Sequence, residues 1–305
     1  MSAKLQAQLL AQIKKLDSIS TAPAILKPLL DMLRLPSEKI RMEKVVALVS
    51  FDGTIAAQCL RMANSPLFGG RQIDTVRGAV MALGLERVRS ILFGLCVNRV
   101  IPNDKWVIDT DAFWRHSLGC ALVTQRMAQK IGYPEPEKAY LAGLLHDIGF
   151  LVNSVLYQKE FRECLRLAAD QHLPLHLIEQ QVLGFTHNET GQILCEQWGL
   201  PKELVDATRT HHDVSLLPAA GPLACLVHLS DLLCRVSYLD YGYEEAIGVD
   251  LSSDPAWQFL VRIHPELENV DVVRFTLDIE GAMDQIVSTV DAVFGCKAMA
   301  APAAT

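Results

Sequence analysis

The chain has 305 residues, of which 50% are hydrophobic and 21% charged, so it can bury one large core or two modest ones and is not an intrinsically disordered protein. Its formal charge is −7 and it contains no run of five basic residues, so we expect no direct binding to nucleic acid. No stretch of about 18 uninterrupted apolar residues and no signal-type N-terminus occurs, so we expect no membrane anchor.

The cysteines point to a reducing compartment. They occupy positions 59, 96, 120, 164, 195, 225, 234 and 296, mostly within apolar helical segments, and no two of them form a C-x-x-C pair. This distribution is typical of reduced, buried thiols. We therefore expect a cytoplasmic protein.

Apolar residues recur at three- and four-residue spacing along most of the chain, which predicts an all-α fold. Residues 1–105 are expected to form an N-terminal helical bundle, which ends at the helix-breaking sequence Pro102-Asn103-Asp104. Its predicted helices are Leu5–Ile19, Ala24–Leu33, Met42–Phe51, Ile55–Ala63, Thr75–Leu83 and Leu85–Val100.

A second helical unit is predicted over residues 106–240, followed by a C-terminal helical extension and tail over residues 241–305. The predicted helices of the second unit are Asp111–Lys130, Pro136–Tyr157, Lys159–Gln171, Pro174–Leu183, His187–Gln197, Lys202–His211 and Pro222–Tyr238. The extension is expected to contain helices at Pro255–Ile263 and Val273–Phe294. We expect it to pack on the scaffold, form a dimer contact or cover the second unit as a lid.

The second unit carries an ordered series of potential metal ligands on several helices. They are His116, His146, Asp147, His187, His211, His212 and Asp231. Neutral imidazole and carboxylate suit Fe, Mn or Zn, and a carboxylate can bridge two ions. We therefore predict one or two divalent transition-metal ions in the core of a helical bundle.

Any one of these histidines alone would more often be a hydrogen-bonded core residue than a ligand, and His172, His176 and His264 are interpreted in that way. Two alternatives stay open within the series. His228 lies three residues before Asp231 and can serve as a ligand or as a partner of one. Asp213 can replace His212.

The order and spacing of the series resemble the H…HD…H…HH…D signature of HD-superfamily metal-dependent phosphohydrolases. His146 follows His116 by 30 positions, His187 follows Asp147 by 40, and His211 follows His187 by 24. This spacing is similar to that of the binuclear branch. The resemblance implies that Asp147 bridges two ions, one held by His116, His146 and Asp231 and the other by His187, His211 and His212.

Further motifs resemble the HDOD family. In the first unit they are Leu60-Arg61-Met62-Ala63-Asn64-Ser65-Pro66-Leu67-Phe68 and the segment from Ile73 through Leu83-Gly84 to Val88-Arg89. In the second they are Phe113-Trp114-Arg115-His116-Ser117, Ala142 to Gly149, and His187 through Gly191 and Trp198 to Pro201. The chain is identified on these motifs, over about residues 15 to 235, as a member of that family, which implies an N-terminal bundle packed on an HD-domain-like bundle.

The resemblance implies a signal-transduction or regulatory role with a protein partner, and leaves a homodimer open. An active metal-dependent phosphohydrolase on a nucleotide or phosphoester is the alternative, with Asp147 bridging the ions and Arg115 as the nearest candidate for a phosphate clamp. Two departures argue against the HD-GYP type of enzyme. Phe150 stands where that branch has a lysine, and nothing after His211-His212 resembles its G-Y-P loop.

Overall fold

The computed structural model describes residues 8–13, 39–50, 53–70, 72–85, 87–88, 92, 107–237, 239–241, 250–264, 267 and 281–291. Within these ranges the regular structure is helical and no strand occurs, which confirms the predicted all-α class. The predicted helix Ala24–Leu33, most of Leu85–Val100 and the boundary at Pro102 lie outside the described residues.

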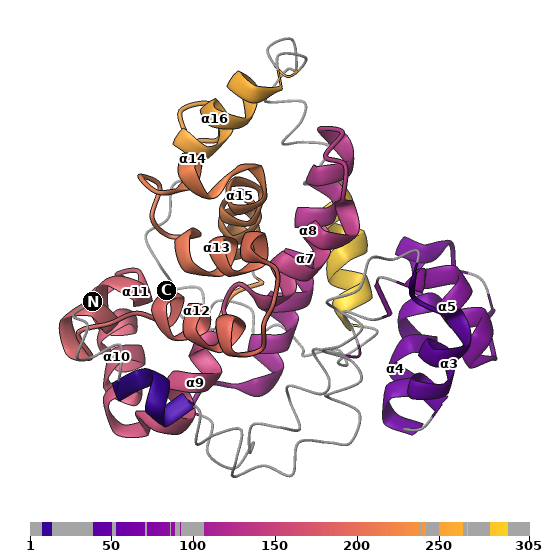
Figure 1. Ribbon diagram of the computed structural model, residues 1–305, viewed down its shortest axis with the longest axis horizontal. Helices are drawn as coiled ribbons and strands as arrows, with labels where there is room; N and C mark the ends of the chain where they lie inside the picture. Colours follow the sequence, from indigo (N-terminus) through magenta and orange to yellow (C-terminus); the bar gives the residue numbers. More distant parts are fainter. Residues whose placement is uncertain are drawn as a thin grey trace, which may run out of the picture.

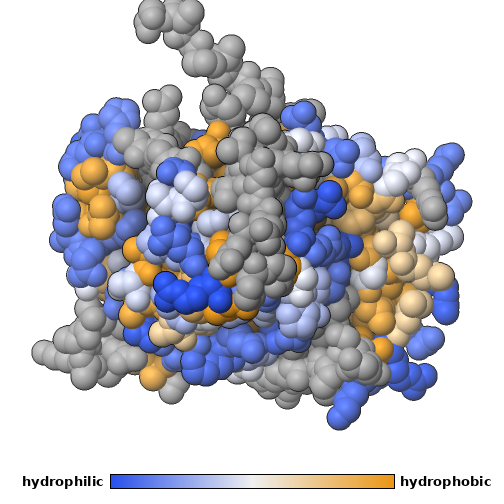
Figure 2. Space-filling view, turned by 90° about the horizontal axis from the view of Figure 1, so that it is seen from above, coloured by the Kyte–Doolittle hydropathy of each residue, from blue (hydrophilic) through white to orange (hydrophobic). Residues whose placement is uncertain are grey.

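Within the predicted N-terminal unit, the described residues from 39 to 88 form a small bundle around a sharp turn, whereas the helical residues 8–13 contact the second unit, where the Tyr157 hydroxyl donates to Gln12. The elements of the bundle are α3 (Met42–Ser50), α4 (Gly53–Ala63), the 3-10 turn η2 (Pro66–Phe68) and α5 (Val76–Leu83). Asn64 closes the turn, because its Nδ2 donates to Ile73 O at 2.8 Å and its Oδ1 accepts from Ile73 N at 2.6 Å. Figure 2 shows apolar surface at the end of the molecule over α3–α5, where Met81 of α5 is 64% exposed.

The second unit is built around the long helix α7, which packs against α8 and α15 (Figure 1). Its helices are α7 (Thr110–Lys130), α8 (Pro136–Leu145), α9 (Gly149–Leu156), α10 (Gln158–Gln171), α11 (Leu175–Val182), α12 (His187–Gln197), α13 (Lys202–Thr210), α14 (Leu217–Ala220) and α15 (Pro222–Val236). The Asp109 carboxylate caps α7 by accepting from the backbone N–H groups of Asp111 and Ala112.

The predicted helix Pro136–Tyr157 is helical over most of its length but is interrupted by the turn residues His146–Ile148, which separate α8 from α9. The break lets α9 approach α12 so closely that a Cβ on Gly149 would lie 1.9 Å from His187 O. An uninterrupted apolar run predicts helix but cannot show an interruption within it. The short helix α14 was not predicted. The stretch Pro136–Leu156 is apolar and long enough to cross a membrane, but 89% of the tested window is buried inside the protein, as in a core helix.

The C-terminal extension contributes α16 (Pro255–Ile263), which packs on α15, and a helix over residues 281–291. In Figure 1 that second helix, in yellow, lies between α7 and the α3–α5 bundle. Thr289 Oγ1 donates to Ser65 Oγ at 3.2 Å, and Asp291 pairs with Arg115 of α7. The extension therefore contacts both helical units.

The described cysteines are all buried and none forms a disulfide, in agreement with the reduced thiols expected from the sequence. Burial raises the pKa of Cys59, Cys195 and Cys225 to about 12, which leaves these thiols protonated at neutral pH.

Candidate metal centre

Two groups of buried ligand atoms lie next to each other in the second unit. One consists of His116, Cys120, His146 and Asp231, and the other of Asp147, His187, His211 and His212. Within each group the ligand atoms all lie within 4.8 Å of one another. The seven residues predicted from the sequence are thus brought together, and Cys120 is the one member that was not predicted.

These side chains come from helix ends and helix faces that converge from across the unit. His116 lies on α7, His146 and Asp147 in the turn after α8, His187 at the start of α12, His211 and His212 directly after α13, and Asp231 on α15. All except His212 are fully buried, and the His212 side chain is 10% exposed.

The Asp147 carboxylate lies between the two groups, with one oxygen facing each. Its Oδ2 is 3.0 Å from His146 Nε2 and 3.6 Å from His116 Nε2. Its Oδ1 is 3.1 Å from His187 Nε2 and 3.2 Å from His211 Nε2. This is the position of a carboxylate that can bridge two cations.

In four of the imidazoles, Nδ1 lies within hydrogen-bond distance of an oxygen acceptor, which orients the ring. The pairs are His116 with Leu239 O at 2.5 Å, His146 with Gly143 O at 2.7 Å, His211 with Thr208 O at 2.9 Å, and His187 with Glu179 Oε2 at 2.6 Å. Because these oxygens can only accept, each Nδ1 carries the hydrogen and the neutral ring presents the Nε2 lone pair toward Asp147.

This orientation requires positive charge between the rings and the carboxylate. Lone pairs on Nε2 and on the Asp147 oxygens repel one another unless a proton or a metal ion lies between them. His187 Nε2 is buried with no hydrogen-bond partner, although Asp147 Oδ1 lies nearby. The donor set of imidazole and carboxylate therefore fits a divalent transition-metal ion.

The ionisation of the metal-free site reflects the same need for cations. Burial lowers the pKa of His187, but the carboxylates of Glu179 and Asp147 outweigh it and raise the pKa to about 10. Burial lowers the pKa of His211 to about 4. The pKa of Asp147 falls well below its usual range despite its burial, because of His146 and His187. In the metal-free protein, protons on selected rings balance the buried carboxylates.

Glu179 of α11 contacts a predicted ligand and was not predicted from the sequence. Its Oε2 accepts from both the backbone N–H and the Nδ1–H of His187, at 2.9 and 2.6 Å, and its Oε1 accepts from Asn153 Nδ2 at 2.8 Å. Such a carboxylate fixes the orientation and raises the basicity of a ligating imidazole. No sequence spacing links Glu179 to the HD signature, since the contact forms only when α11 packs on α12.

Asp231 is held by an arginine on its own helix. Arg235, one turn further along α15, donates from Nε to Asp231 Oδ1 at 2.8 Å and from Nη2 to Asp231 Oδ2 at 2.6 Å. The same Nη2 lies 3.2 Å from His212 Nε2. Tyr241 donates its hydroxyl to Asp147 Oδ2. The four-residue spacing of Arg235 from Asp231, like that of Cys120 from His116, was the available sequence signal.

The remaining candidates lie outside the two groups. Arg115 lies on α7 next to His116, but its guanidinium forms a salt bridge with Asp291, which does not favour the phosphate-clamp role. His228 donates from Nδ1 to His211 O at 2.6 Å, so it supports the backbone of a predicted ligand. Asp213 is exposed and accepts hydrogen bonds from Ser215.

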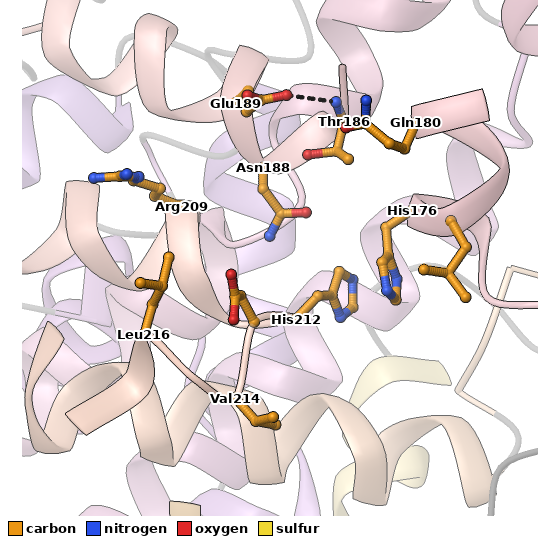
Figure 3. Close-up of a pocket in the computed structure, with 11 residues that line it drawn as sticks. His176, Gln180, Thr186, Asn188, Glu189, Arg209, His212, Val214 and Leu216 are labelled. Atoms are coloured by element: carbon orange, nitrogen blue, oxygen red, sulfur yellow. Dashed lines mark hydrogen bonds between the residues drawn. The ribbon is translucent and has the colours of Figure 1, made fainter. Parts of the chain in front are cut away.

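A pocket of about 450 Å³ opens beside His212 between α11, the start of α12 and the chain after α13. His176 and His212 stack in it with ring centroids 4.5 Å apart (Figure 3). Asn188 lies near its middle, and Arg209 lies on the side away from His176. The pocket connects solvent with His212, the one partly exposed residue among the predicted metal ligands.

Known proteins share this fold. A structure of an HDOD domain protein of unknown function from Geobacter sulfurreducens matches with a TM-score of 0.76 and 24% identity, covering 94% of this chain and 98% of that one. A candidate phosphohydrolase from Shewanella amazonensis SB2B matches with a TM-score of 0.69 and 21% identity, covering 93% and 98%. At these identities the likeness shows the fold alone.

A curated relative, an uncharacterized protein of Treponema pallidum (strain Nichols), is 23% identical over 233 residues. The match covers 75% of this chain but 45% of that protein, so the chain spans less than half of the relative's length. The family model of the HDOD domain matches residues 19–214, which include the turn closed by Asn64 and most of the HD series. The chain therefore belongs to the HDOD family.

Proposed function

We propose that this chain is a cytoplasmic regulatory protein that binds two divalent transition-metal ions in its second unit. The observation that carries the proposal is the Asp147 carboxylate, which has two imidazole Nε2 atoms on each oxygen. His116, His146 and Asp231 would hold one ion with Asp147, and His187, His211 and His212 the other. Iron, manganese and zinc all suit this ligand set.

Side chains cover the site closely, which supports a regulatory role rather than rapid turnover of a substrate. The Phe150 ring covers His187 with 4.1 Å between centroids, and Tyr241 covers His116 with 4.6 Å. Arg235 occupies both oxygens of Asp231. A substrate reaching the bridging carboxylate would have to displace these side chains, whereas an ion requires only small rearrangements.

The site is linked to the beginning of the C-terminal extension. Leu239 O accepts from His116, and the Tyr241 hydroxyl donates to Asp147. A cation at Asp147 competes with the Tyr241 hydrogen bond for the same carboxylate oxygen. We therefore expect metal occupancy to change the position of residues 239–241, and so to pass the state of the site to the extension.

The test measures metal content and backbone protection together. We expect about two equivalents of transition metal in protein purified anaerobically, and loss of both in Asp147→Asn, because neither half of the site is complete without the bridge. Asp213→Asn is the matched control, since that carboxylate is exposed and lies outside both groups. Hydrogen exchange at residues 239–241 should differ between loaded and chelator-treated protein.

Metal-free wild type with the same exchange pattern as protein supplied with iron, manganese or zinc would contradict the proposal. Loss of metal in Asp213→Asn to the same extent as in Asp147→Asn would point to general instability. Circular dichroism of each variant separates that outcome from loss of ligands.

A second candidate function, hydrolysis of a phosphoester, is favoured by the pocket beside His212 (Figure 3). Bound ions would supply an activated water and neutralise charge on phosphoryl oxygens. Within this chain, Asn188 and the exposed Arg209 would bind the substrate, and His176 would stack beside it. Release of inorganic phosphate from nucleotide substrates by metal-loaded wild type, reduced in Arg209→Ala, would establish this function; no release with fully loaded protein would exclude it.

A further inference from the structure

A second pocket, of about 340 Å³, lies where the N-terminal unit, α7 and the C-terminal helix meet. It is lined by Leu67, Phe68, Arg87, Leu122, Gln125, Arg126, Gln129, Ala282, Gln285 and Ile286. None of these residues belongs to the two metal-ligand groups or to the pocket beside His212. Its volume falls in the range of about 300–1,000 Å³ that is usual for small-molecule sites.

Arg87 is held rigidly in the wall of this pocket. Its guanidinium lies 4.6 Å from the centroid of Phe68 and 5.8 Å from that of Tyr140. Nη1 donates to Leu83 O at 2.8 Å, and Nη2 donates to Gln125 Oε1. Among the described residues, the nearest carboxylate oxygen, on Glu137, is 3.8 Å away, beyond hydrogen-bond distance. The charge of Arg87 is therefore fixed in place but only weakly neutralised.

Two buried donors in the wall have no acceptor. Arg87 Nε and Gln125 Nε2 are both buried and make no hydrogen bond. The amide of Gln125 cannot be turned to remove this, because its oxygen already accepts from Arg87 and the turned amide would place two donors face to face. Buried polar groups without partners are rare in folded proteins and often mark the place of a ligand or water.

The pocket is positively charged in a chain whose net charge is −7. Arg87 and Arg126 line it, and none of its lining residues is acidic. Arg126 is exposed and makes no ion pair with the part of the chain that the structure describes. Gln125, Gln129 and Gln285 add amide donors, while Leu67, Leu122 and Ile286 supply an apolar wall.

We propose that this pocket binds a small phosphorylated compound of about the size of a nucleoside monophosphate. The phosphate oxygens accept hydrogen bonds from Arg87 Nε, Gln125 Nε2 and the Arg126 guanidinium, because converging donors of this kind match a multiply charged oxyanion. The organic part packs on Phe68 and its apolar neighbours. This site is separate from the proposed metal centre and does not depend on it.

Binding at this place joins three distant parts of the chain. Phe68 comes from η2, Gln125 and Arg126 from α7, and Gln285 from the helix of residues 281–291, seen in yellow beside α7 in Figure 1. A ligand that contacts all three stabilises their present arrangement relative to one another. The compound thus acts as an effector at the junction of the two helical units.

Isothermal titration calorimetry on the full chain tests the proposal, with AMP, GMP, CMP, UMP and inorganic phosphate as probes. A chelator is present throughout, so that binding through a metal ion is excluded and failure of the metal proposal cannot produce a false result. Arg126→Ala removes one exposed charge and Gln125→Leu one buried donor. Arg162→Ala is the matched control, because it removes an exposed arginine of α10 that lines neither pocket.

We expect saturable binding of at least one nucleoside monophosphate, weakened about tenfold or more in Arg126→Ala, the effect of losing one charged hydrogen bond. Arg162→Ala should bind like wild type, and ligand should slow hydrogen exchange at residues 66–68 and 281–291. Should Gln125→Leu fail to fold, Arg126→Ala alone decides the outcome. The proposal is overturned by the absence of saturable binding at millimolar concentration, by undiminished affinity in Arg126→Ala, or by loss of affinity in Arg162→Ala.

Discussion

Replacing Gly149 with alanine should separate the two halves of the metal centre. A Cβ at this position would lie 1.9 Å from His187 O, 2.7 Å from His187 C and 2.8 Å from Gly191 N. Ordinary contact begins at 3.4 Å, so α9 and α12 would have to move apart by about 1.5 Å. All the atoms contacted are backbone, which cannot rotate away. Because metal–ligand distances tolerate only about 0.2 Å, His187 would be carried out of reach of its ion.

We expect Gly149→Ala to lose about 1–3 kcal/mol of stability from overpacking, with a fall in Tm of about 2–4 °C for each kcal/mol. It should also bind one equivalent of metal, against the two proposed for wild type, since His116, His146 and Asp231 lie on the other side of Asp147. Gly53→Ala is the control, because nothing lies within 4 Å of a Cβ there. Elemental analysis and thermal unfolding, each with and without chelator, measure both effects. A Gly149→Ala protein with two equivalents and an unchanged Tm would refute the reasoning.

Three further expectations concern the same half of the site. Glu179→Gln weakens the acceptor of His187 Nδ1–H and should reduce affinity for the second ion about 10–100-fold in chelator competition. Glu160→Gln, on the exposed face of α10, is the control. Equal affinities of the two variants would contradict the expectation. The pKa of His187 is raised to about 10 in the metal-free protein, so metal must displace a proton at neutral pH. Metal affinity should therefore rise as pH increases toward 10. Calorimetry in buffers of different ionisation enthalpy should detect the released proton. The raised pKa of His187 also stabilises the metal-free fold, fully below the unfolded pKa of 6.5, and this stabilisation is lost as pH rises through about 10. The Tm measured in chelator should therefore fall between these two pH values. A Tm that does not change with pH would argue that His187 is neutral.

The sequence predicted the helical class and the seven residues that the structure brings together, because these depend on local periodicity and on an ordered series of chemically distinctive side chains. It did not predict the turn at His146–Ile148, since an apolar run gives no sign of an interruption in the helix. That turn matters for the site, because it places His146 beyond the end of α8 and Asp147 between the two groups.

Residues that act through another side chain were harder to predict. Glu179 and Tyr241 reach the centre only after α11 and the chain beyond α15 have packed, so no spacing along the sequence connects them with His187 or Asp147. Arg115 illustrates the opposite error, in which a residue next to a ligand in the sequence is expected to face the same site. It is adjacent to His116 in sequence, yet successive residues on a helix point about 100° apart, and its guanidinium pairs with Asp291 instead.

The predicted ligands come from α7, the α8–α9 turn, α12, α13 and α15, so an ion bound among them ties together helices that span more than a hundred residues. Whatever binds the folded chain and not the unfolded one adds to its stability, by about 2.7 kcal/mol when the free ion stands at a hundred times its dissociation constant. Proteases act on the unfolded fraction, so the lifetime of this protein in a cell would follow the supply of metal. Scarcity of the ion would then lower the amount of the protein as well as its occupancy.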